Sequence, residues 1–425
     1  MTFTNWAGNQ SITPAETRTP GSPAEVARAV GDARRLGRRI RMVGTGHSFT
    51  GVALTDGILL RPEGLTGILA FGDDTVTVAA GTPIHVLNVE LDRRGLALAN
   101  MGDITAQTVA GAIQTGTHGS GRSVGGLADQ VTALEIVLAD GSLVTVSEGD
   151  LFDAARVGLG ALGVLTAVTF RVEPAFLLHS SRAPMKFDAV LDALDAFTLE
   201  NEHLDFFWFP HTDQCLVKRN NRAAGGQHTP SRFRTWLDEV FVENTLFEVT
   251  NRMGARFPAL IPPVNRLSGL VLGASDSADT AYKVFTSVRD VKFLETEWAI
   301  PRRHLAGALR EVRRLMDRSP WRVTFPVEVR VTPPSTAWLS TAYDRDSAYI
   351  ACHVYRRTPN PGYFAAVEEV MAGLGGRPHW GKLHNKDATY LSQVYPRFAD
   401  FVALRDRVDP DRIFGNAYLD RVLGG

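Results

Sequence analysis

The sequence is poor in cysteine, has no excess of charge of either sign and has no long hydrophobic run. It has only two cysteines in 425 residues, Cys215 and Cys352, so neither a disulfide framework nor a thiolate metal cluster is expected, and no metal site is predicted. No apolar run approaches the roughly 18 residues that indicate a membrane-spanning helix. The start of the chain, MTFTNWAGNQ, lacks the basic and apolar regions of a secretory signal. These absences predict a protein of the reducing cytoplasm without a membrane span.

The charge balance excludes a class of partners. The chain has 45 lysines and arginines against 46 aspartates and glutamates, which gives a net charge of −1. Nucleic-acid binding driven by bulk charge is therefore not expected. Hydrophobic residues make up 44% of the chain and charged residues 21%, as in soluble globular enzymes. At roughly 150 residues per domain, this length predicts two or three domains.

The pattern of the first 175 residues predicts a compact α/β unit. The expected elements are a helix capped at Ser22, strands at 39–43, 57–60 and 75–79, a helix at 84–94, a hairpin of 135–138 and 143–146, and a strand at 164–172. Beyond Pro174 we expect a helix at 301–318 and strands at 323–332 and 347–355. We therefore divide the chain into a first domain, 1–176, a second domain, 177–377, and a C-terminal segment, 378–425, that returns to the first domain.

Two segments of the second domain allow two interpretations each. Residues 216–236 carry five cations in a stretch that also contains Gly, Asn and Pro, which predicts a solvated loop, with a lid as the alternative. The aromatic stripe Phe206–Phe209 predicts core packing rather than a platform for stacking a ligand.

A first glycine-rich turn follows the strand at 39–43. Its residues Gly44, Thr45, Gly46, His47 and Ser48 let the backbone approach phosphate oxygens closely, because the glycines have no Cβ. A Rossmann motif would need a third glycine where Phe49 stands and a helix directly after it. Nicotinamide binding of that kind is therefore disfavoured. From spacing alone, His47 is either a surface histidine of a tight turn or a contact to a cofactor ring.

A second glycine cluster lies at 110–121. It has four glycines, three hydroxyl side chains and little charge, which favours a buried loop around a large ligand over a flexible linker. Residues 100–103 upstream are expected to border the same cavity. Residues 158–164 form a third stretch suited to close approach.

These three segments, in this order, resemble the FAD-binding domain of the vanillyl-alcohol oxidase superfamily. In the tail, the motifs His379-Trp380-Gly381-Lys382, 409–414 and 416–419 resemble the C-terminal region of sugar-lactone oxidases (L-gulono-1,4-lactone and D-arabinono-1,4-lactone oxidases) and of alditol oxidases. The resemblance implies an α+β fold. It would have a two-subdomain FAD-binding domain of the vanillyl-alcohol oxidase (PCMH) type and a substrate domain built on an antiparallel sheet with flanking helices.

The resemblance implies FAD as cofactor, with His47 bonded covalently to the 8α-methyl group of the flavin. A second link through cysteine is excluded, because no cysteine lies beside the second glycine cluster. The residues that the resemblance assigns to the cofactor are Gly44, Thr45, Gly46, His47, Ser48, Gly102, Asp103, Gly111, Thr115, Thr117, His118, Gly119, Gly163, Val164 and Asn416.

The strand at 323–332 supplies independent support for a substrate site. Glu328 and Arg330 lie two residues apart, so they point the same way, roughly 6.6 Å apart along the strand. On the residues alone, a solvated face with a weak ion pair is the alternative. Glu-x-Arg, however, matches the substrate-binding pair of sugar oxidases. Pro326 cannot donate to a ladder, so an edge or bulge is expected there.

The resemblance adds four further substrate contacts. Lys382 is expected near the flavin, where an ammonium stabilises developing negative charge, with a surface lysine beside Trp380 as the alternative. His353 and Tyr355 are expected walls of the pocket, although a buried core histidine is the alternative for His353. Asp103 stands where the alditol oxidase used for comparison has a small hydroxyl residue, which argues against a pure alditol substrate.

The function implied is FAD-dependent oxidation of a secondary alcohol of an aldonolactone by hydride transfer to flavin N5. Catalysis is assigned to Glu328, Arg330 and Lys382, and O2 or another acceptor reoxidises the flavin. One alternative is an alditol oxidase that converts polyols such as xylitol or sorbitol to an aldose and H2O2. Two others are a flavin-retaining binding protein without turnover and a colourless nucleotide-sugar-binding protein.

Overall fold

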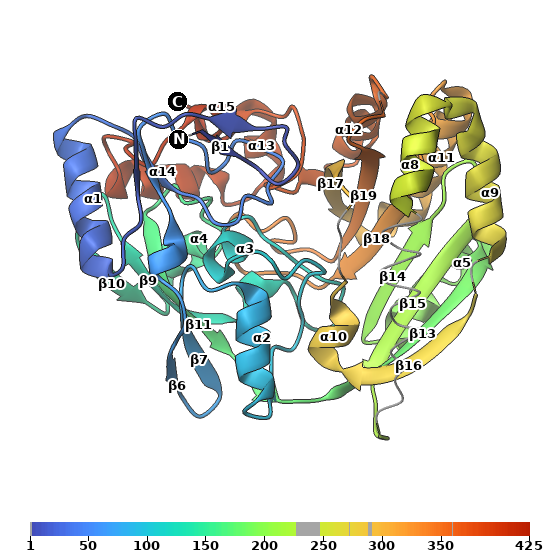
Figure 1. Cartoon of the computed structure of the whole chain (residues 1–425), viewed down its shortest axis with the longest axis horizontal. Coiled ribbons are helices and arrows are strands. Elements are labelled where there is room, and N and C mark those ends of the chain that lie inside the picture. Colours follow the sequence, from blue (N-terminus) through green and yellow to red (C-terminus); the bar gives the residue numbers. More distant parts are fainter. Residues whose placement is uncertain (1, 227–246, 272, 288–290, 359) are drawn as a thin grey trace.

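The computed structural model describes residues 2–226, 247–271, 273–287, 291–358 and 360–425. Figure 1 shows two lobes side by side, the first built by the N-terminal part of the chain and the second on one large sheet. None of the helices in these ranges is long and apolar enough to cross a membrane. The α+β class expected from the sequence is confirmed.

The first lobe contains a small parallel sheet and a helix that packs on it. Its strands are β3 (Glu16–Arg18), β5 (Ile58–Leu60) and β4 (Ile40–Met42), in the order β3-β5-β4. Helix α1 (Pro23–Arg35) begins where predicted, because the Ser22 side chain accepts a hydrogen bond from the backbone N–H of Glu25. Its buried face consists of Val26, Ala29, Val30 and Ala33.

A five-stranded antiparallel sheet forms the rest of this lobe. Its strands, in order, are β10 (Leu143–Val146), β9 (Val131–Val137), β11 (Val164–Arg171), β7 (Thr75–Ala79) and β6 (Ile68–Phe71). The helices are α2 (Ile84–Asp92), α3 (Val109–Gln114) and α4 (Gly149–Ala155). The hairpin predicted at 135–146 is confirmed by the pairing of β9 with β10. The second glycine cluster was predicted to be a loop throughout, but its first half is helix α3, capped by Thr108.

The second lobe is built on an eight-stranded sheet. Its strands, in order, are β16 (Ser275–Thr280), β13 (Leu177–Lys186), β15 (Gln214–Arg222), β14 (His203–Trp208), β18 (Val327–Thr332), β19 (Ser347–Tyr355), β17 (Phe293–Pro301) and β20 (Arg377–Pro378). All neighbours in this sheet pair antiparallel. The helices of this lobe are α5 (Phe187–Asp192), α6 (Leu194–Glu200), α8 (Phe247–Arg256), α9 (Ile261–Val271), α10 (Ala281–Phe285), α11 (Leu305–Arg318) and α12 (Tyr363–Gly373).

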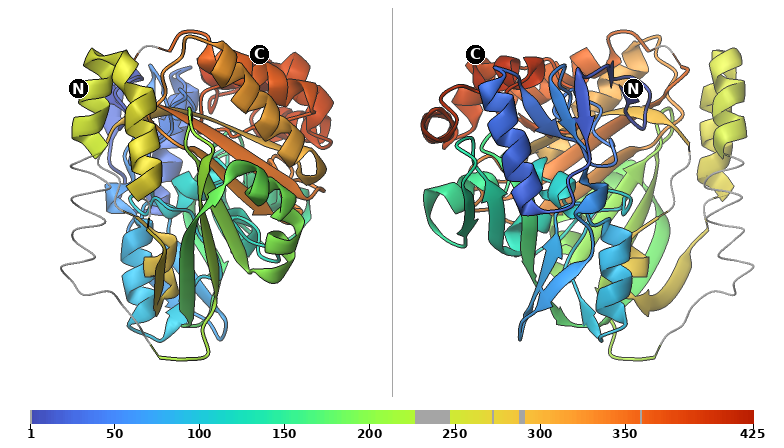
Figure 2. Two further views of the ribbon diagram at one scale, coloured as in Figure 1. Left: turned by 90° about the vertical axis from the view of Figure 1, so that its right-hand side faces the viewer. Right: turned by 60° about the vertical axis from the view of Figure 1, so that its left-hand side comes forward.

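The C-terminal helices pack against the first lobe. They are α13 (Ala388–Val394), α14 (Phe398–Val408) and α15 (Ala417–Leu423), and Figures 1 and 2 show them at the end of the molecule that carries both termini. Phe401, Leu404 and Leu419 share one hydrophobic cluster with Val78 and Val168 of the five-stranded sheet. The segment that follows the second lobe therefore returns to the first. The remaining short strands are β1 (Phe3–Thr4), β2 (Ser11–Ile12), β8 (Leu96–Ala97) and β12 (Glu173–Pro174).

Three details of the second lobe differ from the sequence prediction. The cationic stretch was predicted to be a solvated loop, but its beginning belongs to strand β15, where Lys218 is half-buried and donates to the Val284 carbonyl. Arg232 and Arg234 of that stretch lie outside the described residues. The strand expected from 323 begins only at Val327, because Pro326 has no N–H for the ladder. The helix expected from Pro301 begins at Leu305, because Pro301 is the last residue of β17.

Candidate active site

A first cavity of about 1020 Å³ lies in the N-terminal lobe. It is bordered by the first glycine turn, the beginning of α3 and the residues around the start of β11. Predicted cofactor residues that line it are Gly44, Thr45, Gly46, His47, Ser48, Gly111, Thr115, Gly163 and Val164. The three segments that the sequence singled out thus meet around one space.

The first glycine turn has no room for a side chain at either of its glycines. Gly46 has φ +75°, a conformation that favours glycine, and a Cβ there would lie 2.9 Å from Cζ of Phe3. A Cβ on Gly44 would lie 2.6 Å from the Thr108 hydroxyl. No helix follows the turn, since residues 49–57 are irregular. The turn therefore leaves the backbone at its glycines uncovered by side chains. It differs from the Rossmann motif, as predicted.

His47 stands where the first cavity meets a second one and lines both. Its Nδ1 is buried and has no hydrogen-bond partner among the described residues, while the ring of Trp6 stacks on it with centroids 5.5 Å apart. Burial, assisted by the charge of Lys382, lowers the pKa of His47 to about 4. The imidazole is thus neutral at physiological pH and has an unpartnered ring nitrogen at the border of the two cavities, which fits attachment of a flavin.

Asn416 does not reach either cavity. Its Oδ1 accepts a hydrogen bond from the N–H of Leu419 and caps α15. Its Nδ2 donates to the carbonyls of Gly51, Val52 and Leu54. Direct contact with the cofactor was expected, but the side chain is committed to holding a loop whose residues 52–54 line the first cavity.

The second cavity, of about 730 Å³, lies between the two lobes. It shares His47, Ser48, Gln107 and Thr115 with the first cavity, so the two adjoin each other. Residues from both lobes and from the C-terminal segment line it. Predicted site residues among them are Gly102, Asp103, Thr117, His118, Glu328, Arg330, His353 and Lys382.

The sheet positions one group of charges in this cavity. Arg330 Nη2 lies 2.6 Å from Glu328 Oε1, and its Nε lies 3.9 Å from Asp205 on β14. Burial alone would lower the pKa of Arg330, but Glu328 and Asp205 raise it above its ordinary value. The Glu328–Arg330 pair is therefore not the solvated surface pair that the sequence left as an alternative.

A second group of charges comes from β17 and the C-terminal segment. Lys382 Nζ donates to Glu295 Oε2, and Glu295 Oε1 lies 3.4 Å from Nε2 of His353. Burial alone would raise the pKa of Glu295, but Lys382 and His353 lower it to about 2. Glu295 is thus an anion that fixes the ammonium of Lys382 at the cavity wall.

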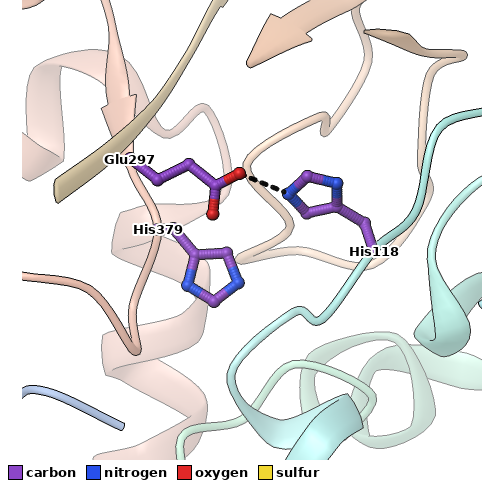
Figure 3. Close-up of side chains that lie close together, drawn as sticks. All are labelled: His118, Glu297 and His379. Atoms are coloured by element: carbon purple, nitrogen blue, oxygen red, sulfur yellow. Dashed lines mark ion pairs between the residues drawn. The ribbon is translucent and has the colours of Figure 1, made fainter. Parts of the chain in front are cut away.

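A third group consists of His118, Glu297 and His379 (Figure 3). His118 Nε2 lies 3.4 Å from Glu297 Oε1, and both side chains are buried. The Tyr349 ring lies 3.7 Å from the His118 ring, centroid to centroid. Burial opposes ionisation of Glu297, but a proton on His118 or His379 and the charge of Lys382 lower its pKa well below the ordinary value.

Sequence reasoning missed Glu295 and Glu297. The available signal was the alternation in Phe293–Pro301, where two acids stand two residues apart, as Glu328 and Arg330 do. Because opposite residues of an antiparallel ladder share a face, Glu328, Ala351 and Glu297 form one row across β18, β19 and β17.

Two further predicted residues lie outside the cavity linings. Tyr355 was expected at the pocket wall, but it is packed in the core of the second lobe and its hydroxyl donates to Glu248 on α8. Gly119 lines neither cavity, and its role is close packing, since a Cβ there would lie 2.3 Å from the Met101 carbonyl oxygen.

Comparison with known proteins adds the following findings. The family model described as D-arabinono-1,4-lactone oxidase matches residues 168–422, and the one described as FAD binding domain matches residues 14–147. The chain is 41% identical to L-gulono-1,4-lactone dehydrogenase of Mycobacterium tuberculosis, over 99% of both chains. It is 34% identical to L-gulonolactone oxidase of Bos taurus, over 99% of this chain and 98% of the relative. A solvent-stable cholesterol oxidase has the same fold, with a TM-score of 0.83 at 17% identity over 99% of this chain and 96% of that chain.

Proposed function

The chain belongs to the D-arabinono-1,4-lactone oxidase family, and on this premise we propose that it oxidises a secondary alcohol of a sugar-derived aldonolactone, with FAD as the electron acceptor. The observation that carries the proposal is the second cavity, in which the Glu328–Arg330 pair and the Glu295–Lys382 pair line one space. That space adjoins the cavity formed by the glycine turns. A compact, polyhydroxylated ring suits such a lining, because it offers many donors and acceptors to buried charged groups.

FAD supplies the hydride acceptor, and the protein supplies orientation and electrostatics. We propose that the residues of the first glycine turn, with Gly111, Thr115, Gly163 and Val164, hold the cofactor. His47, Gln107 and Thr115 line both cavities, so a cofactor held by the first cavity would adjoin the space for the substrate. The neutral imidazole of His47, with its unpartnered Nδ1, is the proposed point of covalent attachment.

Three side chains are proposed to act on the substrate. Arg330 donates hydrogen bonds to lactone oxygens, while Glu328 accepts one from a hydroxyl group and fixes the guanidinium. Lys382 stabilises the negative charge that develops on the carbinol oxygen as the hydride leaves. Burial of Glu328, Glu295 and Glu297 keeps this site poor in water, so each of these charges acts strongly.

Asp103 and His353 complete the proposed substrate site. Asp103 accepts a hydrogen bond from the Ser287 hydroxyl at 2.7 Å and lines the second cavity. His353 lines it as well. Family membership does not favour the alditol oxidase or the binding protein without turnover.

The test is anaerobic reduction of the flavin by a panel of substrates. L-gulono-1,4-lactone and D-arabinono-1,4-lactone should bleach the visible flavin band, whereas xylitol and sorbitol should not. Bleaching by the polyols alone would overturn the lactone proposal. Oxygen consumption after reduction then distinguishes O2 from another acceptor, such as a dye.

We also propose that the protein works in the cytoplasm. Cys215 and Cys352 are both buried and unpaired, which suits a reducing compartment. Cell fractionation with a cytoplasmic marker tests this, and recovery with an exported marker would contradict it.

A further inference from the structure

Two glutamates on β17 each face a histidine in the same way. Glu295 Oε1 lies 3.4 Å from Nε2 of His353, and Glu297 Oε1 lies 3.4 Å from Nε2 of His118. The Nδ1 of His353 contacts the Pro326 carbonyl at 3.2 Å, and the Nδ1 of His118 contacts the Gly119 carbonyl at 2.9 Å. A carbonyl only accepts hydrogen bonds, so in both rings Nδ1 carries the proton. In the neutral ring, Nε2 then presents a lone pair to the carboxylate.

The two pairs differ in how the charge of the glutamate is balanced. Glu295 is bonded to the ammonium of Lys382. Among the described residues, Glu297 has no lysine or arginine within ion-pair distance, and its ion-pair partner is His118. Glu297 and His118 therefore oppose each other as two hydrogen-bond acceptors. One proton placed in the position between them would turn the contact into a hydrogen-bonded ion pair.

His379 does not fill this position. Its Nδ1 accepts a hydrogen bond from the Gly381 N–H, so the neutral ring carries its proton on Nε2. Burial lowers the pKa of His379 to about 4, and the ring is therefore neutral at physiological pH. Donor atoms of His118, Glu297 and His379 lie within 4.8 Å of one another. A metal ion would need a free lone pair from His379, which this tautomer does not offer, so the cluster is suited to a proton.

We propose that His118 and Glu297 form the proton acceptor of the reaction, an inference that rests on the proposed function. As the carbinol carbon gives its hydride to the oxidised flavin, the O–H bond of the same carbinol breaks and its proton moves to Nε2 of His118. The C–O bond becomes the carbonyl of the product, and the new N–H donates to Glu297. The two electrons leave with the hydride, so no further reactant is needed.

Other charged and titratable groups face this pair from every element around it. They are Glu295 on β17, Arg330 on β18, Tyr349 on β19, Asp129 before β9, and His379 and Lys382 from the C-terminal segment. Glu297 is the one directly opposite Nε2 of His118. Removing its charge should therefore weaken the proton affinity of His118 more than any other single neutral substitution.

The experiment measures flavin reduction by saturating L-gulono-1,4-lactone under anaerobic conditions, as a function of pH. In the wild type the rate should rise with pH and level off once His118 has lost its Nε2 proton. Glu297→Gln should lower the plateau at least about tenfold and move the rise to lower pH. Glu295→Gln should leave unchanged the pH at which the rate of flavin reduction rises. Glu368→Gln, which removes a buried glutamate paired with Lys386 outside the cavity, is the matched control and should behave as wild type.

Proton release gives a second readout. An indicator dye in weak buffer counts the protons released per flavin reduced, and the spectrum of the reduced flavin gives its own protonation state. On the plateau the wild type should retain the hydroxyl proton, whereas Glu297→Gln should release about one more proton per flavin. If Glu297→Gln matches Glu368→Gln in both pH profile and proton count, the inference is overturned.

A measurement without flavin separates this inference from the proposed function. In the apoprotein, NMR follows the titration of the His118 ring, with the signal assigned by His118→Asn. The midpoint should move to lower pH in Glu297→Gln, and an unchanged midpoint overturns the pairing whether or not a lactone reduces the flavin. If Glu297→Gln does not fold, His118→Gln, compared with Glu368→Gln, gives the same two kinetic readouts.

Discussion

The ammonium of Lys382 donates a hydrogen bond to Glu295, a residue 87 positions earlier in the chain and on another element. Lys382 also lies over the Phe49 ring, with Nζ 5.4 Å from the centroid. The side chain is therefore held from two directions at the wall of the second cavity. A lysine fixed in this way suits stabilisation of charge on a substrate oxygen, because it needs little reorganisation during the reaction.

Lys382→Met should lower kcat/KM for the lactone by at least about tenfold, or roughly 1.4 kcal/mol. The loss should fall mainly on kcat, because the ammonium acts on charge that appears in the transition state. Steady-state kinetics with a dye acceptor provide the measurement. Lys386→Met, which removes a lysine paired with Glu368 away from the cavity, is the control. Equal kinetics for the two variants would exclude Lys382 from the chemistry.

Glu328→Gln and Arg330→Ala should each reduce kcat/KM by at least about tenfold. Arg330→Ala leaves the buried carboxylate of Glu328 without its partner, and Glu328→Gln leaves the guanidinium with only the longer contact to Asp205. Both changes therefore disturb the geometry that holds the lactone. Arg330→Lys should not restore activity, since an ammonium cannot reproduce the planar guanidinium. Arg310→Ala removes an exposed arginine at 3.8 Å from Asp192 and should leave the kinetics unchanged. Wild-type kinetics for Glu328→Gln would remove that residue from the site.

The sequence was most informative where local pattern and function coincide. Alternation in 327–332 placed Glu328 and Arg330 on one face, and the structure shows them paired there. The glycine turns also meet as predicted, because a bend without Cβ atoms is a local property. The roles assigned to these residues and the boundaries of the domains remain predictions.

What could not be predicted depends on long-range contacts. Glu295 and Glu297 become site residues only because β17 pairs with β19 and the segment after β20 folds back to bring Lys382 alongside. Tyr355 shares the alternation of His353, but it lies at the end of β19, where its hydroxyl meets Glu248. Lys218 shows the same limit, since a cation expected in a solvated loop lies half-buried on strand β15 and donates to the Val284 carbonyl.

The proposed flavin linkage predicts a change in extractability. Wild-type protein precipitated with acid should keep its yellow colour in the pellet, whereas His47→Ala should release the flavin into the supernatant. The variant should still bind FAD, since the other residues of the first cavity remain. His85→Ala, at an exposed histidine of α2, should retain the pellet colour. Full release of flavin by the wild type would mean that His47 is not a tether.

Acid should destabilise the protein through His384, a buried residue outside both cavities. Burial, assisted by the charge of Arg421, lowers the pKa of His384 from 6.5 to about 3. Below pH 6.5 the unfolded chain therefore binds a proton that the folded state excludes. The free energy of unfolding should fall by up to about 1.4 kcal/mol per pH unit from this group, and by about 2 kcal/mol between pH 6.5 and 5. Above about pH 7.5 the unfolded chain carries almost no proton on this group either, so its contribution to the slope disappears.

His384→Gln should remove this part of the acid destabilisation. The Tyr418 hydroxyl donates to the Trp380 carbonyl, so His384 Nε2, at 2.9 Å, is the donor to Tyr418, and a glutamine amide can replace that donor without titrating. Urea unfolding at pH 7, 6 and 5 should show a shallower loss of stability in His384→Gln than in the wild type. His85→Gln, at an exposed histidine, should keep the wild-type slope. Parallel slopes for wild type and His384→Gln would show that another group controls acid stability. A difference in slope arises only from a residue that binds its proton in the unfolded state and not in the folded state.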